Sequence, residues 1–181
     1  MQQAPEGGFA GRTNKLVDAC YSWWVGGCWA LIEASENRPP TSEPIWNRRK
    51  PPIPTHHYPL PSFRPPCTKH LLLCLEALAK YLLSCCQHPQ GGLRDKPPMA
   101  ADFYHTLYSI AGLSATQYHN SYDTSVQCAD EDDQVFKWIV CEEPVEGEPV
   151  DRVGALHPIF VLPWGDAERI RRWFVTLDRH E

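Results

Sequence analysis

Three residues whose side chains bind metals stand near the starts of two expected helices: Asp18, Cys20 and His105. Two residues of a continuous helix are about 200° apart, but a helix N-terminus lets Asp18 and Cys20 converge, with Asp18 as cap and Cys20 in the first turn. A histidine from a neighbouring helix completes an oxygen, sulfur and nitrogen set. Zn²⁺ accepts all three donor types, and three protein ligands leave a fourth position open, as in catalytic zinc sites. The spacing alone equally allows a helix cap, a buried thiol and a core histidine.

Two cations precede this cysteine. Arg12 and Lys15 lie in Gly11-Arg12-Thr13-Asn14-Lys15, which leads into the expected helix start. Fixed charge and unpaired N–H groups would together form an anion pocket there. The same two helix starts are rich in aromatic residues, namely Tyr21, Trp23, Trp24, Tyr104 and Tyr108. Such a pocket beside an aromatic wall suits a ligand with a charged head and a long apolar tail. The alternatives are a solvated loop and ordinary core aromatics.

Helical periodicity marks the elements that must position these residues. Apolar residues between 69 and 86 recur with helical spacing, at Leu71, Leu72, Leu75, Leu78, Ala79 and Leu82. Near the C-terminus, Asp166 has the character of a cap before Ile170, Trp173, Phe174 and Leu177. The stretches 18–35 and 102–118 contain no proline and are rich in aromatics and alanine, which indicates buried helices. Sustained period-2 alternation is absent, so few strands are expected and the predicted fold class is all-α.

A repeat connects the two helix starts. Gly7-Gly8-Phe9 precedes Asp18 by eleven residues, and Gly91-Gly92-Leu93 precedes Asp102 by the same eleven. We call residues 7–24 the first copy and residues 91–108 the second copy. A glycine turn, a short polar loop and an inward helix, occurring twice, indicate stacked helical hairpins. Helical-repeat folds need several units to close their core, so further units are expected upstream.

Composition excludes several classes of protein. The chain has 181 residues, is 43% hydrophobic and carries a net charge of −5. This charge argues against a general nucleic-acid binder, and no apolar run approaches the ~20 residues that span a bilayer. Since no basic and apolar leader begins the sequence, a cytoplasmic location is expected, with the eight cysteines as reduced thiols.

Two segments depart from the average composition. The stretch 38–66 holds ten of the 18 prolines and is expected to be an extended or irregular insert. Residues 123–151 carry ten acids against one base, Lys137, which is typical of a solvated acidic loop, with a docking surface for a basic partner as the alternative.

These motifs also resemble a known family. The first copy, Gly-Gly-Phe-Ala-Gly-Arg-Thr-Asn-Lys-Leu-Val-Asp-Ala-Cys-Tyr-Ser-Trp-Trp, is similar to the zinc and diphosphate segment of protein prenyltransferase β subunits. The segments 91–97, 102–106 and 111–114 resemble the next repeat, and 156–160 the segment before the last helix. The sequences Asp-Lys-Pro (95–97) and Asp-Phe-Tyr-His-Thr (102–106) are most similar to those of the farnesyl-transferring members. The resemblance implies that 1–181 is the C-terminal part of an α/α toroid. It also implies a separate α subunit as partner, and transfer of farnesyl from farnesyl diphosphate to the cysteine of a C-terminal CaaX motif.

The resemblance assigns roles to individual residues. Asp18, Cys20 and His105 match the family's zinc ligands, and zinc would bind the incoming cysteine as thiolate. Arg12, Lys15 and Tyr21 match diphosphate contacts that would stabilise the leaving group during catalysis. The isoprenoid and peptide positions are matched by Trp24 and Tyr104, beside the aromatic Tyr108. Asp95 matches a carboxylate that assists Mg²⁺ at the diphosphate, which favours farnesyl transfer. Geranylgeranyl transfer and an inactive fragment or binding scaffold remain the alternatives.

Overall fold

The computed structural model describes residues 3–36, 74–123, 138–140 and 149–177 of the chain. The Pro-rich insert 38–66 and most of the acidic loop 123–151 lie outside these residues. The described elements are, in chain order, helices α1 (Tyr21–Trp24), α2 (Cys28–Glu36) and α4 (Leu75–Tyr81), the π-helix η1 (Leu82–Cys86), helix α5 (Phe103–Gln117), strands β1 (Asn120–Tyr122) and β2 (Trp138–Val140), the 3-10 turn η3 (Pro149–Asp151) and helix α6 (Trp164–Leu177). The fold is therefore mostly helical, as expected from the sequence.

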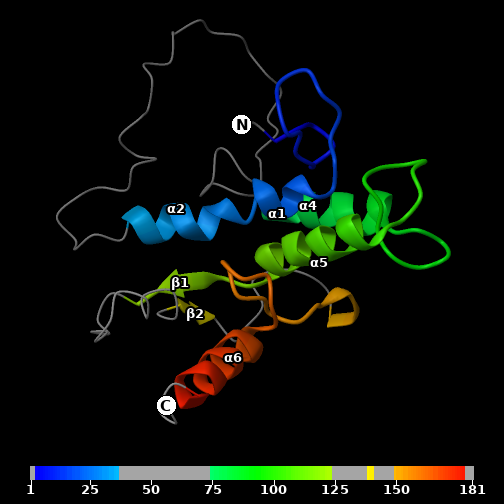
Figure 1. Ribbon diagram of the computed structural model, residues 1–181. Coiled ribbons are helices and arrows are strands. Elements are labelled where there is room, and N and C mark those ends of the chain that lie inside the picture. Colours follow the sequence, from blue (N-terminus) through cyan, green and yellow to red (C-terminus); the bar gives the residue numbers. More distant parts are fainter. Residues whose placement is uncertain (1–2, 37–73, 124–137, 141–148, 178–181) are drawn as a thin grey trace, which may run out of the picture.

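The core lies between the N-terminal loop, α4 with η1, and α5. Helix α5 lies beneath α1 and α4 and packs against both (Figure 1). Leu78 and Leu82 are almost fully buried and face Phe9 and Val17 of the loop and Leu113 of α5. Their spacing is the helical spacing noted in the sequence, so the apolar face expected over 69–86 is the face that forms the core within the described residues 74–86.

The expected single helix over 18–35 is wrong, because it is broken into α1 and α2. The break lies at Val25, Gly26 and Gly27, where Gly26 donates to the carbonyl of Tyr21 and Gly27 to that of Trp23. A side chain at Gly27 would lie 2.6 Å from the Trp23 carbonyl oxygen. Two adjacent glycines weaken the helix and admit this close turn.

The repeat is confirmed in three dimensions. Gly7 and Gly91 have nearly the same left-handed φ, 96° and 95°, a conformation that residues with a Cβ rarely adopt. Equivalent hydrogen bonds close the two turns and the two loops: Gly7 N–H to Ala4 O (2.9 Å) and Gly91 N–H to His88 O (2.9 Å), then Asp18 N–H to Phe9 O (3.0 Å) and Asp102 N–H to Leu93 O (3.4 Å). The two loops thus have the same geometry, and they position Asp18 and Asp102 at the starts of neighbouring helices.

The two copies are joined by a close contact of α1 with α5. Ser22 of α1 is buried and donates to the carbonyl oxygens of Ala19 (2.6 Å) and Tyr108 (3.2 Å). A Cβ at Gly112 would lie 1.9 Å from the Ser22 hydroxyl oxygen. Gly112 is therefore required for the close approach that brings the helix starts together.

The C-terminal part differs from expectation in one detail. Helix α6 begins at Trp164, so Asp166 lies in its first turn rather than capping it. The apolar residues that recur with helical spacing along α6 are about half exposed in the described structure: Ile170 (45%), Trp173 (57%) and Phe174 (57%). Strands β1 and β2 form one antiparallel pair with Tyr122 opposite Trp138. Within the described residues, none of the helices has both the length and the apolar character that crossing a bilayer requires.

Candidate metal centre and anion pocket

The structure brings Asp18, Cys20 and His105 together. One ligand atom of each, a carboxylate oxygen, the thiol sulfur and a ring nitrogen, lies within 4.8 Å of the other two. His105 Nε2 and Asp18 Oδ1 are 3.4 Å apart. Cys20 is buried, with 4% of its surface exposed, whereas the other two are half-buried. Residues from separate copies of the repeat thus converge on one point.

The backbone before α1 explains how Asp18 and Cys20 share a side. The sequence predicted that Asp18 caps the helix, and this prediction is wrong. Helix α1 begins at Tyr21, and Cys20 occupies the N-cap position without a side-chain cap bond. Instead Asp18 Oδ1 accepts from the Cys20 N–H (2.9 Å), and Ala19 N–H donates to the Asp95 carbonyl (2.9 Å). This tight bend, not helical geometry, puts the carboxylate beside the thiol.

His105 is positioned differently, in the first turn of α5. Asp102 caps this helix in the expected way, since its Oδ1 accepts from the His105 N–H (2.8 Å). Its other oxygen, Oδ2, lies 2.6 Å from Nδ1 of the His105 ring. These hydrogen bonds from His105 lower the pKa of the Asp102 carboxyl. The sequence predicted Asp102 only as the start of a helix, and its contact with the ring was not predicted.

The thiol of Cys20 is protonated in the metal-free chain. Burial is the largest of the causes that together raise its pKa to about 12. The hydrogen bond and negative charge of Asp18 act in the same direction, and a hydrogen bond from Tyr104 opposes them. A divalent cation among these donors would reverse this balance, because it offsets the carboxylate charge and favours the thiolate. Oxygen, sulfur and nitrogen donors in a half-buried pocket fit a borderline-soft metal such as zinc, with room for a fourth ligand.

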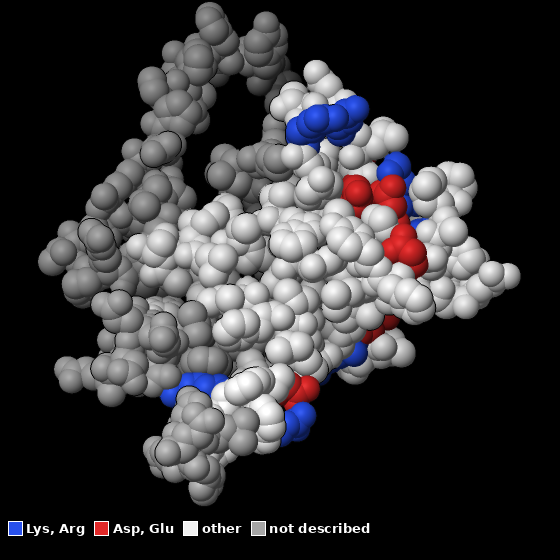
Figure 2. All heavy atoms as spheres, in the orientation of Figure 1, with Lys and Arg blue, Asp and Glu red and all other residues white. Residues whose placement is uncertain are grey.

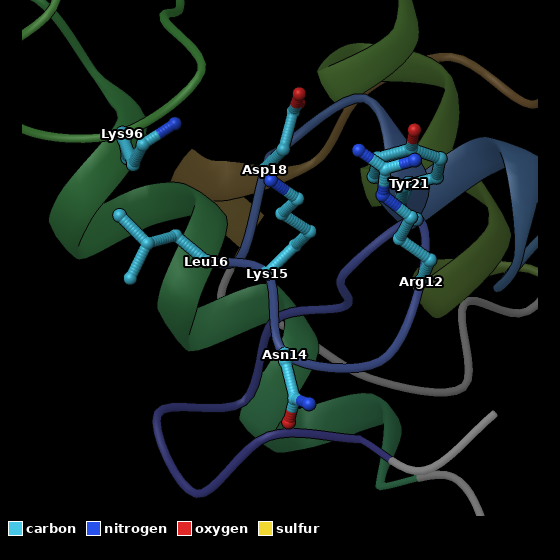
Figure 3. Close-up of a pocket in the computed structure, with 8 residues that line it drawn as sticks. Arg12, Asn14, Lys15, Leu16, Asp18, Tyr21 and Lys96 are labelled. Atoms are coloured by element: carbon cyan, nitrogen blue, oxygen red, sulfur yellow. The ribbon is translucent and has the colours of Figure 1, made fainter.

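A pocket of about 830 Å³ adjoins this centre, and Asp18 belongs to both. Arg12, Lys15 and Tyr21, all expected from the sequence, line it (Figure 3). Lys96 also lines it, from the opposite side to Arg12 and Tyr21, with Lys15 and Asp18 between them (Figure 3). Lys96 was not predicted as a pocket residue. The available signal was its place in the Gly-Gly loop of the second copy, which is the counterpart of the loop that holds Arg12.

Two features of the pocket loop fix its shape. Asn14 has a φ of 61°, a left-handed conformation that asparagine tolerates better than most residues. Gly11 lies against the Tyr21 ring, and a Cβ there would be 2.1 Å from the tyrosine hydroxyl oxygen. Arg12 and Lys15 are both exposed, and neither pairs with a carboxylate of the described residues, so their charge remains available to an anion.

Aromatic side chains continue from the metal centre along α1 and α5. Trp24 Nε1 donates to the Tyr104 hydroxyl (3.1 Å), and the Trp24 ring packs against that of Tyr108 with centroids 4.6 Å apart. Tyr104 also meets His105 edge-on at 5.1 Å. The face of the molecule over α1 and α5 is almost free of charged side chains at its centre (Figure 2). Trp24 and Tyr104 remain about half exposed, so this aromatic cluster is a surface rather than core packing.

Asp95 lies next to the pocket without being one of its lining residues. Its Oδ2 pairs with Lys96, and its Oδ1 is buried without a hydrogen-bond partner among the described residues. Its backbone carbonyl accepts from Ala19, which ties the second copy directly to the bend that holds Asp18 and Cys20.

Comparison with known proteins gives consistent results. The family model of the prenyltransferase alpha-alpha toroid domain matches residues 1–162. A protein farnesyltransferase subunit beta of Pyricularia oryzae is 40% identical over 98% of this chain and 30% of its own length. The Schizosaccharomyces pombe protein of the same name is 34% identical over 93% of this chain and 35% of its own. A geranylgeranyl transferase type-2 subunit beta of Saccharomyces cerevisiae is 30% identical over 66% of this chain and 26% of its own. The chain thus spans about a third of the length of these relatives.

Proposed function

This chain belongs to the prenyltransferase alpha-alpha toroid family, and we propose that it provides the metal centre and the diphosphate pocket of a zinc-dependent protein farnesyltransferase β subunit. The reaction is transfer of a farnesyl group from farnesyl diphosphate to the cysteine thiol of a C-terminal CaaX motif. The partner is a prenyltransferase α subunit, as the relatives' designation as β subunits suggests.

One observation carries the proposal: the three donor atoms that converge within 4.8 Å share Asp18 with a pocket lined by three cations. Zinc bound by Asp18, Cys20 and His105 would supply a Lewis acid that lowers the pKa of a substrate thiol. Asp18 then faces the thiol on one side and the anion pocket on the other. This arrangement brings a nucleophile and a leaving group to adjacent positions.

The pocket residues act on the leaving group. Arg12, Lys15 and Lys96 line one pocket, where they would bind the diphosphate and stabilise the charge that develops as the carbon–oxygen bond breaks. Tyr21 lines the same pocket, and its hydroxyl would donate a hydrogen bond to the diphosphate. The unpartnered Oδ1 of Asp95 fits the role of one Mg²⁺ ligand, with diphosphate oxygens and water as the others.

The aromatic surface binds the chain of the isoprenoid. Trp24, Tyr104 and Tyr108 contact one another beside the metal centre and present apolar ring faces without charge. An uncharged aromatic wall next to a cationic pocket matches a substrate with an apolar tail on a charged head.

The test is to co-express the 181-residue chain with a fungal farnesyltransferase α subunit, then measure zinc content and transfer of radiolabelled farnesyl to a CaaX peptide. We expect one zinc per chain and transfer that is lost in Cys20→Ala. Cys28→Ala is the matched control, since Cys28 is exposed and outside the metal centre. Full zinc content in the Cys20→Ala variant would overturn the proposal. So would a wild-type complex that contains no zinc and transfers no farnesyl group.

Geranylgeranyl transfer is the second candidate, because a geranylgeranyl transferase type-2 subunit beta is 30% identical to the chain. Competition between farnesyl and geranylgeranyl diphosphate for the same complex separates the two. The proposal expects farnesyl transfer to dominate at equal concentrations, and dominance of the longer group would favour the second candidate.

A further inference from the structure

Asp102 makes two separate contacts with His105, and they engage different oxygens. Oδ1 accepts from the His105 backbone N–H at 2.8 Å, which is the bond of an ordinary helix cap. Oδ2 lies 2.6 Å from Nδ1 of the ring, which helix capping does not require. At neutral pH the carboxylate can only accept, so Nδ1 must be the protonated ring nitrogen.

The opposite ring nitrogen faces the metal centre. With the proton held on Nδ1, Nε2 carries the lone pair, and it is Nε2 that lies 3.4 Å from Asp18 Oδ1. The ring is also packed edge-on against Tyr104, with centroids 5.1 Å apart. One edge of the imidazole is hydrogen-bonded and one face is packed, so its orientation is fixed before any ligand arrives.

The repeat supplies an internal comparison. Asp18 and Asp102 occupy equivalent places, and each donates its backbone N–H to a carbonyl oxygen of its loop, that of Phe9 and that of Leu93 respectively. In the first copy, the carboxylate itself enters the metal centre. In the second copy, it lies behind a histidine that does so. Of these two equivalent residues, Asp18 is itself a donor of the centre, and Asp102 contacts a donor, His105.

We propose that Asp102 is a positioning residue that fixes the tautomer and orientation of His105 so that Nε2 is presented to the metal centre. This inference rests on the proposed function for the metal, but the contact of Asp102 with the His105 ring on which it depends is present without one. The residue touches neither the metal position nor the substrate pocket, since it is absent from the groups that line them.

Two substitutions separate positioning from capping. Asp102→Ser keeps a good cap for α5 but its hydroxyl is too short to serve the backbone N–H and the ring together, whereas Asp102→Ala loses both contacts. A role limited to capping predicts that Asp102→Ser behaves as wild type. The positioning role predicts that both variants bind zinc about 10–100-fold more weakly, as removal of supporting residues typically does. Only Asp102→Ala should lower the midpoint of denaturant unfolding.

The experiment has two measurements on the 181-residue chain. Nitrogen-15 NMR of the imidazole groups, without metal, reports the tautomer of His105: the wild type should carry the proton on Nδ1, and Asp102→Ser should lose this preference. Competition with a chromophoric chelator then gives zinc affinity. An Asp102→Ser variant with wild-type tautomer and wild-type affinity would overturn the inference. A wild type that holds the Nδ1 tautomer but binds no zinc would instead overturn the proposed function, so the two failures are distinguishable.

Discussion

The first copy and the second copy follow the same path through a left-handed glycine and back through equivalent backbone hydrogen bonds. The two copies differ in where the helix begins. In the second copy α5 begins at Phe103, directly after Asp102, and the aspartate becomes a cap. In the first copy α1 begins at Tyr21, and the bend through Ala19 and Cys20 leaves the Asp18 carboxylate beside the thiol.

This difference shows how one repeat unit yields two kinds of residue. A helix that starts at once uses its aspartate to hold the backbone, and places the residue of the first turn, His105, toward the centre. A helix that starts two residues later in its copy frees the aspartate to act as a metal-binding donor. The local backbone, rather than the residue type, decides which role the same side chain has.

The largest effect is expected from removing the donor that the second copy contributes. His105→Ala should weaken zinc binding by more than the ~10–100-fold that removal of a supporting residue costs, because a direct ligand is lost. Chelator competition measures it, with His119→Ala as control, since His119 is exposed and pairs with Glu33 away from the centre. Equal affinity in His105→Ala and wild type would show that the first copy binds metal without the second.

The two glycine turns should differ in their tolerance of a side chain. Gly7→Ala and Gly91→Ala share a left-handed strain of about 1–2 kcal/mol. At Gly7 the new Cβ would also lie 2.2 Å from the Ala77 carbonyl oxygen, whereas nothing lies within 4 Å at Gly91. Overpacking should add about 1–3 kcal/mol at Gly7 alone. Urea unfolding measures both, and equal losses would contradict the difference in packing.

The contact between the copies is tested at Gly112. Gly112→Ala should cost about 1–3 kcal/mol of unfolding free energy, because its Cβ would collide with Ser22 and push α1 from α5. Gly165→Ala is the matched control, a helical glycine of α6 with open space around it. An undiminished stability for Gly112→Ala would mean that the two copies are not held by this contact.

A smaller, pH-dependent effect belongs to the first copy. Because the pKa of Cys20 is raised to about 12, the thiol is protonated near neutrality and metal binding must displace its proton. Zinc affinity should therefore rise with pH, by about tenfold per unit, equivalent to about 1.4 kcal/mol. Chelator competition at pH 7 and pH 8, corrected for the chelator's own protonation, checks it. An affinity that is independent of pH would argue against a thiolate ligand.

The equivalence of the two copies was predictable from the sequence, because a Gly-Gly pair marks the start of each copy. Glycine adopts the left-handed conformation of these turns more easily than other residues do. The eleven-residue spacing placed Asp18 and Asp102 at equivalent sites, and the donor types gave the metal centre. The pocket cations Arg12 and Lys15 followed from their position before the helix.

The parts that were missed depend on contacts distant in sequence or on backbone detail. The break at Gly26 and Gly27 reflects a competition between helix formation and close packing that periodicity does not report. Lys96 enters the pocket only because the second copy folds against the first. The contact of Asp102 with the His105 ring requires a rotamer, which spacing alone does not fix. In helix α6 the apolar pattern predicted the helix itself, although the residues that form the pattern are about half exposed in the described structure.

The central claim is that one metal centre is built from both copies, with Cys20 as its sulfur ligand. Cobalt substitution tests it most directly, because coordination by a thiolate gives a charge-transfer absorption that oxygen and nitrogen ligands do not. The account predicts this absorption in the wild-type chain and in Cys28→Ser, and its loss in Cys20→Ser. Its absence from the wild type, or its persistence in Cys20→Ser, would contradict the account.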